Sequence, residues 1–203
     1  LYGGVHTLPP YEQAKGTDWY KGTANAIYQN ISFIDSYDPE YVIILSGDQI
    51  CKQDYADFLR FHKEKGAEFS VAVMEVDWKE ASRFGLMVAD EDDRITEFQE
   101  KPPVPKSNLA SMGIYIFNWD VLKKYLEEDE ADPNSKNDFG MNIIPALLRD
   151  GRKMYAYHFN GYWRDVGTID SLWEANMEVL DPENSGIDIF DEKWKIYSRN
   201  PVL

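Results

Sequence analysis

Short apolar runs alternate with amphipathic segments along the first part of the chain. Residues 41–45 form a continuous, mostly β-branched run, which is typical of a strand buried on both faces of a parallel sheet. Residues 54–65 repeat apolar positions at helical spacing and are followed by Gly66, a common residue after the last turn of a helix. A second apolar run covers residues 69–76. This strand–helix–strand order predicts an α/β fold with a mixed, mostly parallel sheet.

The middle of the chain has a different pattern. Two strand-like stretches, residues 84–89 and 94–99, flank an acidic turn and predict a hairpin. There is no internal repeat or low-complexity linker, so a single domain is expected. Further elements expected from the spacing are helices over residues 22–34 (with Thr23 as N-cap), 119–128, 143–148 and 168–180, and strands over residues 111–117 and 154–159.

The charge of the chain limits its partners. The 21 Lys and Arg against 36 Asp and Glu give a formal net charge of −15, which repels the phosphates of nucleic acid. A small phosphate ligand is not excluded, because it needs only a few local cations and a bound metal. Cys51 is the single cysteine, which excludes an internal disulfide and indicates the cytoplasm. No apolar run approaches the roughly 20 residues that cross a bilayer, so no membrane is expected as a partner.

Two carboxylates stand at positions suited to a metal ion. Asp48 follows the apolar run 41–45, and ligands of open α/β sheets bind beyond the carboxyl ends of the strands. Asp165 lies in an aromatic, glycine-flanked segment that leads into a helix. If Asp165 reaches Asp48 in space, the pair could share one Mg²⁺ and clamp a triphosphate. The alternatives are an ordinary turn at Asp48, and at Asp165 an ion pair with Arg164 or a helix cap.

Other polar residues carry weaker signals. Lys101 is followed by two prolines and could neutralise a phosphate, while Glu100 beside it could accept hydrogen bonds from sugar hydroxyls. The alternative is a solvated strand end. His62 and His158 are expected to be packed rather than catalytic, and Cys51 is expected to be a small buried residue.

Together these segments resemble the bacterial glucose-1-phosphate adenylyltransferase family, which has the sugar-nucleotide nucleotidyltransferase fold. The similar stretches follow the order found in the family over nearly the whole chain. They are WYKGTANAIYQN (19–30), IILSGDQICKQDY (43–55), FGLM (84–87) with EFQEKP (97–102), ASMGIYIFNW (110–119), DFGMNIIP (138–145) and GYWRDVGTIDSLWEANM (161–177).

The resemblance implies a Rossmann-like, glycosyltransferase-A-like catalytic domain and a set of site residues. It implies that Asp48 and Asp165 bind Mg²⁺ and act in catalysis together with Lys101. Residues implied to bind glucose 1-phosphate are Tyr20, Gly85, Glu100, Lys101 and Ser111, with Lys101 on the phosphate; Gly22 and Thr23 fall near the nucleotide.

The resemblance also implies the reaction, in which the adenylyl group of ATP passes to α-D-glucose 1-phosphate to give ADP-glucose and pyrophosphate. The pathway would be glycogen synthesis, and the full-length enzyme would be an allosteric homotetramer or hetero-oligomer. Three alternatives stay open: an enzyme for UTP or dTTP, a non-catalytic regulatory homologue, and a sugar-phosphate binding module.

The sequence departs from the family pattern in two ways. Gln49 and Cys51 stand where the family usually has His and Tyr. The N-terminal glycine-rich segment that holds the ATP phosphates is missing, as is the C-terminal left-handed β-helix domain. We therefore expect an N-terminally incomplete catalytic domain over residues 1–190, a linker over residues 191–203, and little activity from this chain alone.

Overall fold

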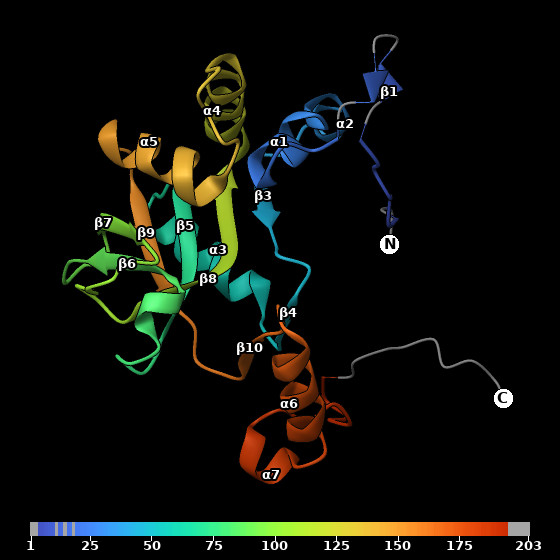
Figure 1. Cartoon of the computed structure of the whole chain (residues 1–203), viewed down its shortest axis with the longest axis vertical. Helices are drawn as coiled ribbons and strands as arrows, with labels where there is room; N and C mark the ends of the chain where they lie inside the picture. Colours follow the sequence, from blue (N-terminus) through green and yellow to red (C-terminus); the bar gives the residue numbers. More distant parts are fainter. Residues whose placement is uncertain (1–3, 11, 14–15, 18, 195–203) are drawn as a thin grey trace, which may run out of the picture. The chain divides into compact units, whose positions relative to one another are not determined.

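A computed structural model describes residues 4–10, 12–13, 16–17 and 19–194 (Figure 1). These residues form two compact units. The first unit contains the described residues up to Leu45 together with Ala56–His158, and the second contains Ser46–Tyr55 and the described residues from Phe159 onward. The expected linker over residues 191–203 lies outside the described residues from position 195. The expected domain boundaries stay a prediction.

The first unit is built around a six-stranded sheet with the order β7-β6-β8-β5-β9, in which β3 pairs with β8. The long strand β8 contacts three neighbours, since β6 pairs with its first half, β3 with its second half, and β5 with both. The strands are β3 (Tyr41–Ile44), β5 (Phe69–Glu75), β6 (Gly85–Ala89), β7 (Ile95–Glu100), β8 (Leu109–Asn118) and β9 (Met154–His158); apart from this sheet, β1 (Glu12–Gln13) pairs with β2 (Gly16–Thr17).

The mixed α/β character is confirmed, but the expectation of a mostly parallel sheet is wrong. Among the described strands of this sheet, only β5 and β9 pair in parallel. The strands β3 and β5 do run in the same direction, as the strand–helix–strand pattern predicts. However, β8 lies between them and runs the opposite way, so that each forms an antiparallel pair with it. β3 is also only half-buried, with Ile43 37% exposed.

Helices cover this sheet. The predicted helix over residues 22–34 is broken into α1 and α2 at Asn30, whose buried side-chain amide donates to the Ala26 carbonyl and to the Tyr20 hydroxyl. The N-cap of α1 is Gly22 rather than Thr23. The helical segments of this unit are α1 (Thr23–Tyr28), α2 (Ile31–Asp35), α3 (Tyr55–Glu64), the 3₁₀ turn η1 (Ala81–Arg83), α4 (Trp119–Ala131), the π-helical turn η2 (Phe139–Ile143) and α5 (Ile144–Arg149).

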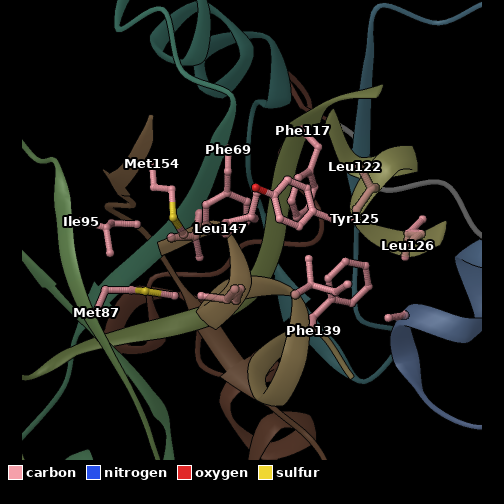
Figure 2. Packing of buried hydrophobic residues seen from close by; sticks show 14 of the residues in the cluster. Phe69, Met87, Ile95, Phe117, Leu122, Tyr125, Leu126, Phe139, Leu147 and Met154 are labelled. Atoms are coloured by element: carbon pink, nitrogen blue, oxygen red, sulfur yellow. The ribbon is translucent and has the colours of Figure 1, made fainter. Parts of the chain in front are cut away.

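An aromatic and aliphatic core lies between the sheet and the helices α4 and α5 (Figure 2). The rings of Phe69 and Phe117 lie 4.7 Å apart, and that of Phe139 lies 5.9 Å from Phe117. Phe139 is 4% exposed. Because Phe139 sits at the start of η2, the core anchors the polar loop just before it, which contributes to the site described below.

The second unit contains a two-stranded antiparallel ribbon, formed by β4 (Gln49–Cys51) and β10 (Trp163–Asp165), and the helices α6 (Ile169–Val179) and α7 (Pro182–Ser185). Thr168 caps α6 in a capping box with Ser171. None of the helices in the described part of the chain is long and apolar enough to cross a membrane.

Candidate functional site

Asp48 and Asp165 lie at the same end of the ribbon in the second unit. Asp165 ends β10 opposite Gln49 of β4, and the amide of Val166 donates to the Asp48 carbonyl oxygen at 2.9 Å. The two aspartates are therefore diagonal neighbours although more than a hundred residues separate them in the sequence.

Their carboxylates converge on the space beside Gly167. A Cβ atom placed on Gly167 would stand 3.4 Å from Asp165 Oδ1 and 3.9 Å from Asp48 Oδ2. The Ser46 hydroxyl donates to the other oxygen of Asp48, and the Gly167 amide donates to Asp165 Oδ1 at 3.2 Å. The glycine leaves both acidic side chains open to solvent at the turn.

This pair of oxygen donors fits Mg²⁺. Magnesium is usually held by one or two carboxylates plus phosphates and water rather than by a cage of protein ligands. Within the described residues, no group of three or more His, Cys, Asp or Glu side chains is arranged to hold a metal. A two-carboxylate site of this kind would depend on a phosphate ligand to fill the remaining positions.

The structure shows neither of the two alternatives for Asp165, an ion pair with Arg164 or a cap of the following helix. Arg164 pairs instead with Glu178 and, at 3.5 Å, with Glu174. The hydrogen bond from Arg164 is the main reason that the pKa of Glu178 is lowered. The cap of α6 is Thr168. Asp165 therefore remains available for a ligand.

A second cluster lies in the first unit around Glu100. Gly85 of β6 is the cross-strand partner of Glu100 on β7. A Cβ atom on Gly85 would stand 3.2 Å from Glu100 Oε2, and one on Gly140 would stand 2.9 Å from the same oxygen and 3.4 Å from Asp138 Oδ1. We call Gly85, Glu100, Asp138 and Gly140 the Glu100 cluster. Its two glycines leave room for the two carboxylates to approach each other.

The electrostatics of the Glu100 cluster favour ligands that donate hydrogen bonds. Partial loss of water raises the pKa of Glu100; the neighbouring Lys101 opposes this effect and Asp138 adds to it. Two carboxylates that repel each other gain from a ligand that donates to both, as a polyhydroxyl compound does.

Tyr115 of β8 feels the charges of the Glu100 cluster, and Ser111 of the same strand is hydrogen-bonded to Tyr115. Gly113 between them has a φ of 67°, and the register of β8 against β5 shifts there. Burial raises the pKa of Tyr115, a hydrogen bond from Ser111 opposes this effect, and the charges of Asp138 and Glu100 add to it. Ser111 is thus hydrogen-bonded to Tyr115, whose pKa is raised by both carboxylates of the Glu100 cluster.

Lys101 follows Glu100 in an unusual backbone conformation. Its φ is 42°, in the left-handed region that non-glycine residues rarely adopt. Its amide donates to the Phe84 carbonyl at 3.2 Å, and its side chain is exposed and makes no ion pair with a residue that the structure describes. Strained residues of this kind cluster at ligand sites.

The structure gives other partners to the remaining predicted residues. The Tyr20 hydroxyl donates to the Leu8 carbonyl and accepts from Asn30. Gly22 packs against the backbone of residues 136–137, where a Cβ atom would meet the Asn137 oxygen at 2.4 Å. The Thr23 hydroxyl donates to Asp138 Oδ2 at 3.0 Å and accepts from the Phe139 amide. Thr23 is therefore linked directly to the Glu100 cluster.

Sequence reasoning missed Asp138, Gly140 and Tyr115 as site residues. Asp138 and Gly140 belong to the stretch DFGMNIIP, which in the sequence contributes only to the resemblance. A usable signal was that Asp138 can cap the next turn, and it does accept from the Met141 amide at 2.9 Å. Tyr115 follows Ser111 inside an apolar strand and gives no signal of its own.

The expectations for histidine and cysteine are mixed. His62 is packed as expected, with no exposed surface. The packed interpretation is wrong for His158, which lies at the exposed end of β9 and contacts Asp93 at 3.0 Å. Cys51 is half-buried, and burial raises the pKa of its thiol, which makes it a poor nucleophile.

Comparison with known proteins gives a consistent result. A family model described as "Nucleotidyl transferase" matches residues 4–182. The chain is 67% and 65% identical, over 201 residues each, to the glucose-1-phosphate adenylyltransferases of Clostridium beijerinckii and Clostridium acetobutylicum. It is 58% identical over 199 residues to the protein of that name from Geobacillus stearothermophilus. These matches cover 98–99% of this chain but 51–53% of the relatives, so the chain spans about half the length of the curated relatives it matches.

Proposed function

The chain belongs to the nucleotidyl transferase family, and from this we propose that it acts in the transfer of the adenylyl group of ATP to α-D-glucose 1-phosphate, with release of pyrophosphate. The names of the two clostridial relatives support ATP and glucose 1-phosphate as the substrates. The structural observation that carries the proposal is the convergence of Asp48 and Asp165 beside Gly167. Two carboxylates that converge at a turn could hold a divalent metal ion that in turn binds a triphosphate.

In this proposal, the second unit handles the triphosphate. Asp48 and Asp165 would hold Mg²⁺, which when bound would neutralise charge on the phosphates. The Ser46 hydroxyl and the Gly167 amide orient the two carboxylates by hydrogen bonds. Gly167 itself matters because a side chain there would fill the space between them.

The first unit would bind the sugar phosphate. Glu100 and Asp138 would offer acceptors for the sugar hydroxyls, and Ser111, which is hydrogen-bonded to Tyr115, would offer a hydroxyl. Lys101 would contact the phosphate as a point charge. A phosphate monoester is already a nucleophile, so no general base is required, and the main task of these residues is to position it. The Tyr20 hydroxyl is already hydrogen-bonded to Leu8 and Asn30, so Tyr20 would contact the sugar phosphate through its ring. Gly22 and Thr23 would lie near the nucleotide.

The wider role follows the same proposal. Adenylyl transfer to glucose 1-phosphate would supply the activated sugar for bacterial glycogen synthesis in the cytoplasm. The intact protein would be an allosterically regulated homotetramer or hetero-oligomer. Its size in solution, measured by light scattering with multi-angle detection, would test the oligomer directly.

Pyrophosphate release by the intact protein tests the reaction. With glucose 1-phosphate present, ATP should give much faster release than UTP or dTTP. Asp48→Asn should lower turnover by at least about a hundredfold, since it removes charge from the proposed metal site, with little change in thermal unfolding. Asp57→Asn, on the exposed face of α3, is the matched control and should behave as the wild type. Near-normal ADP-glucose synthesis by Asp48→Asn would show that Asp48 is not part of the mechanism. Faster pyrophosphate release with UTP than with ATP would show that the nucleotide substrate is not ATP.

Lys101→Ala tests the phosphate contact. We expect this change to raise the KM for glucose 1-phosphate by about tenfold or more, and that for ATP much less, because a charge-assisted contact to one substrate is lost. Lys106→Ala removes a lysine of the same loop that pairs with Glu97, and it should leave both KM values unchanged. Equal effects of Lys101→Ala on the two substrates would argue against a specific contact.

A further inference from the structure

The carboxylate of Glu130, near the end of α4, is the centre of a polar network in the first unit. Lys21 Nζ lies 2.8 Å from Glu130 Oε1. The side-chain amides of Asn25 and Asn137 donate to Glu130 Oε2 at 2.8 Å and 3.2 Å. Asn25 and Asn137 are 1% and 7% exposed, so these bonds replace water that the two amides cannot reach. Glu130 therefore joins α4 to α1 and to the loop after α4.

Asn137 is held through its side-chain nitrogen and through both of its backbone polar groups. Its side-chain nitrogen also donates to Asp129 Oδ2 at 3.1 Å, and its backbone amide donates to the Ser135 hydroxyl at 2.8 Å. Its carbonyl accepts from the Ala24 amide at 2.8 Å. These contacts hold it at a φ of 53°, in the left-handed region. Asn tolerates this region better than most residues, and the surrounding bonds fix it there.

The residue that follows is Asp138 of the Glu100 cluster. Asp138 receives the Thr23 hydroxyl on one oxygen and the Met141 amide on the other. The orientation of the Asp138 carboxylate thus depends on the backbone conformation of Asn137 and on the position of Thr23 in α1. Glu130 supports both positions, because it accepts a hydrogen bond from Asn137 and one from Asn25 of α1.

We propose that Glu130 and Asn137 are positioning residues that fix Asp138 in the Glu100 cluster, so that the proposed sugar-phosphate site is formed before the ligand arrives. This inference rests on the proposed function of the cluster. Glu130 acts through Asn137 and Asn25, and its role is to set the geometry of the groups that meet the ligand.

Asn137→Asp gives the sharpest kinetic test. The change keeps the size of the side chain, removes the donor and places a third negative charge beside Asp129 and Glu130. Initial rates of the intact protein are measured at saturating ATP with varied glucose 1-phosphate. We expect the KM for glucose 1-phosphate to rise by about ten- to a hundredfold and kcat to change much less. The reason is that a misplaced Asp138 carboxylate would bind the sugar phosphate more weakly. A purely structural role would lower the active fraction, and so kcat, at constant KM.

The same substitution in the same loop provides the control. Asn134 is exposed, and Asn134→Asp should match the wild type in both constants. A KM for Asn137→Asp that stays within about twofold of the wild-type value, whatever happens to kcat, would overturn the proposal.

A second measurement does not depend on catalysis. In Glu130→Gln, which keeps the shape but loses one acceptor, amide hydrogen exchange is followed without substrate. The Phe139 and Met141 amides, which donate to Thr23 and Asp138, should exchange faster than in the wild type, while the Val71 amide in the sheet should not change. Unchanged exchange at Phe139 and Met141 would overturn the positioning role. If calorimetry shows that the wild-type protein does not bind glucose 1-phosphate, the proposed function fails. The exchange result would still show whether Glu130 and Asn137 fix the position of Asp138.

Discussion

His62 is a buried histidine with hydrogen-bond partners at both ring nitrogens. Its Nε2 lies 2.9 Å from Asn118 Oδ1, and its Nδ1 lies 2.8 Å from the Ser70 hydroxyl oxygen. The ring of Tyr41 packs edge-on against it, and Lys63 follows it in α3. Burial lowers the pKa of His62 below the ordinary value of 6.5; the bond to Asn118 opposes the shift, and the charge of Lys63 adds to it.

This lowered pKa predicts a loss of stability in mild acid. Below about pH 6.5 the unfolded chain takes up a proton at His62 that the folded chain does not, so the free energy of unfolding should fall by up to about 1.4 kcal/mol per pH unit until the folded pKa is reached. Urea unfolding between pH 7.5 and 5.5 measures the slope. His62→Gln should flatten it. An unchanged slope in His62→Gln would assign the effect to other groups.

Single residues also show what the sequence could and could not reveal about the site. The sequence suggests Asp48 as a candidate because it follows an apolar run and Gly47, and it suggests Asp165 because this residue lies in an aromatic, glycine-flanked segment. The capping position of Asp138 can be read from the sequence, but its place in the Glu100 cluster cannot, because Thr23, Gly140 and Glu100 meet it only in the folded chain. The roles of all these residues stay predictions until the variants are measured.

At the scale of elements, the contact between α1 and the loop before η2 depends on Gly22. This residue has an extended backbone that any residue could adopt, so the requirement for glycine is one of space. The Asn137 and Lys136 carbonyl oxygens would lie 2.4 Å and 2.7 Å from a Cβ atom. Neither is a flexible side chain that could move aside.

Gly22→Ala should therefore separate α1 from this loop. We expect a loss of about 1–3 kcal/mol in the free energy of unfolding, typical of overpacking, with a fall in Tm of several degrees. Thermal and urea unfolding measure the effect. Gly47→Ala is the matched control, because nothing lies within 4 Å of its Cβ position, and its stability should change much less. Equal stability of the two variants would mean that the loop before η2 can move to make room for the Cβ atom with little loss of free energy.

The elements that the sequence predicted best are those with a long, regular pattern. The helix over residues 54–65 and the hairpin around residues 90–93 form as α3 and as β6–β7, because their signals are local. The ribbon β4–β10 was missed, since three-residue strands carry no measurable periodicity. The direction of β8 could not be predicted either, because it depends on which distant strands are its neighbours.

At the scale of the whole molecule, the excess of acidic residues is a cost to the folded state. A formal net charge of −15 over 203 residues produces self-repulsion, which relaxes when the chain unfolds. Salt screens charges separated by more than about 10 Å at 0.1 M, so this repulsion should weaken as salt is added.

We accordingly expect Tm to rise between 10 mM and 300 mM NaCl at pH 7.5. Differential scanning calorimetry measures the change, and choline chloride at the same concentrations shows whether it is specific to sodium. A fall in Tm with both salts would mean that local ion pairs, such as Arg152 with Glu68, stabilise the fold more than the net charge destabilises it.

The place of β8 in the sheet has a consequence for synthesis. Among the described strands, β3 pairs only with β8, which leaves the ribosome much later. At 5–20 residues per second, the nascent chain carries an unpaired β3 for roughly 3 to 15 seconds. During that interval its apolar side chains and free edge are available to ribosome-associated chaperones, or to the same strand of a neighbouring nascent chain. Slower translation between β3 and β8 would lengthen this interval, so the yield of folded protein should depend on the codons of the hairpin β6–β7 as well as on the amino acids they encode.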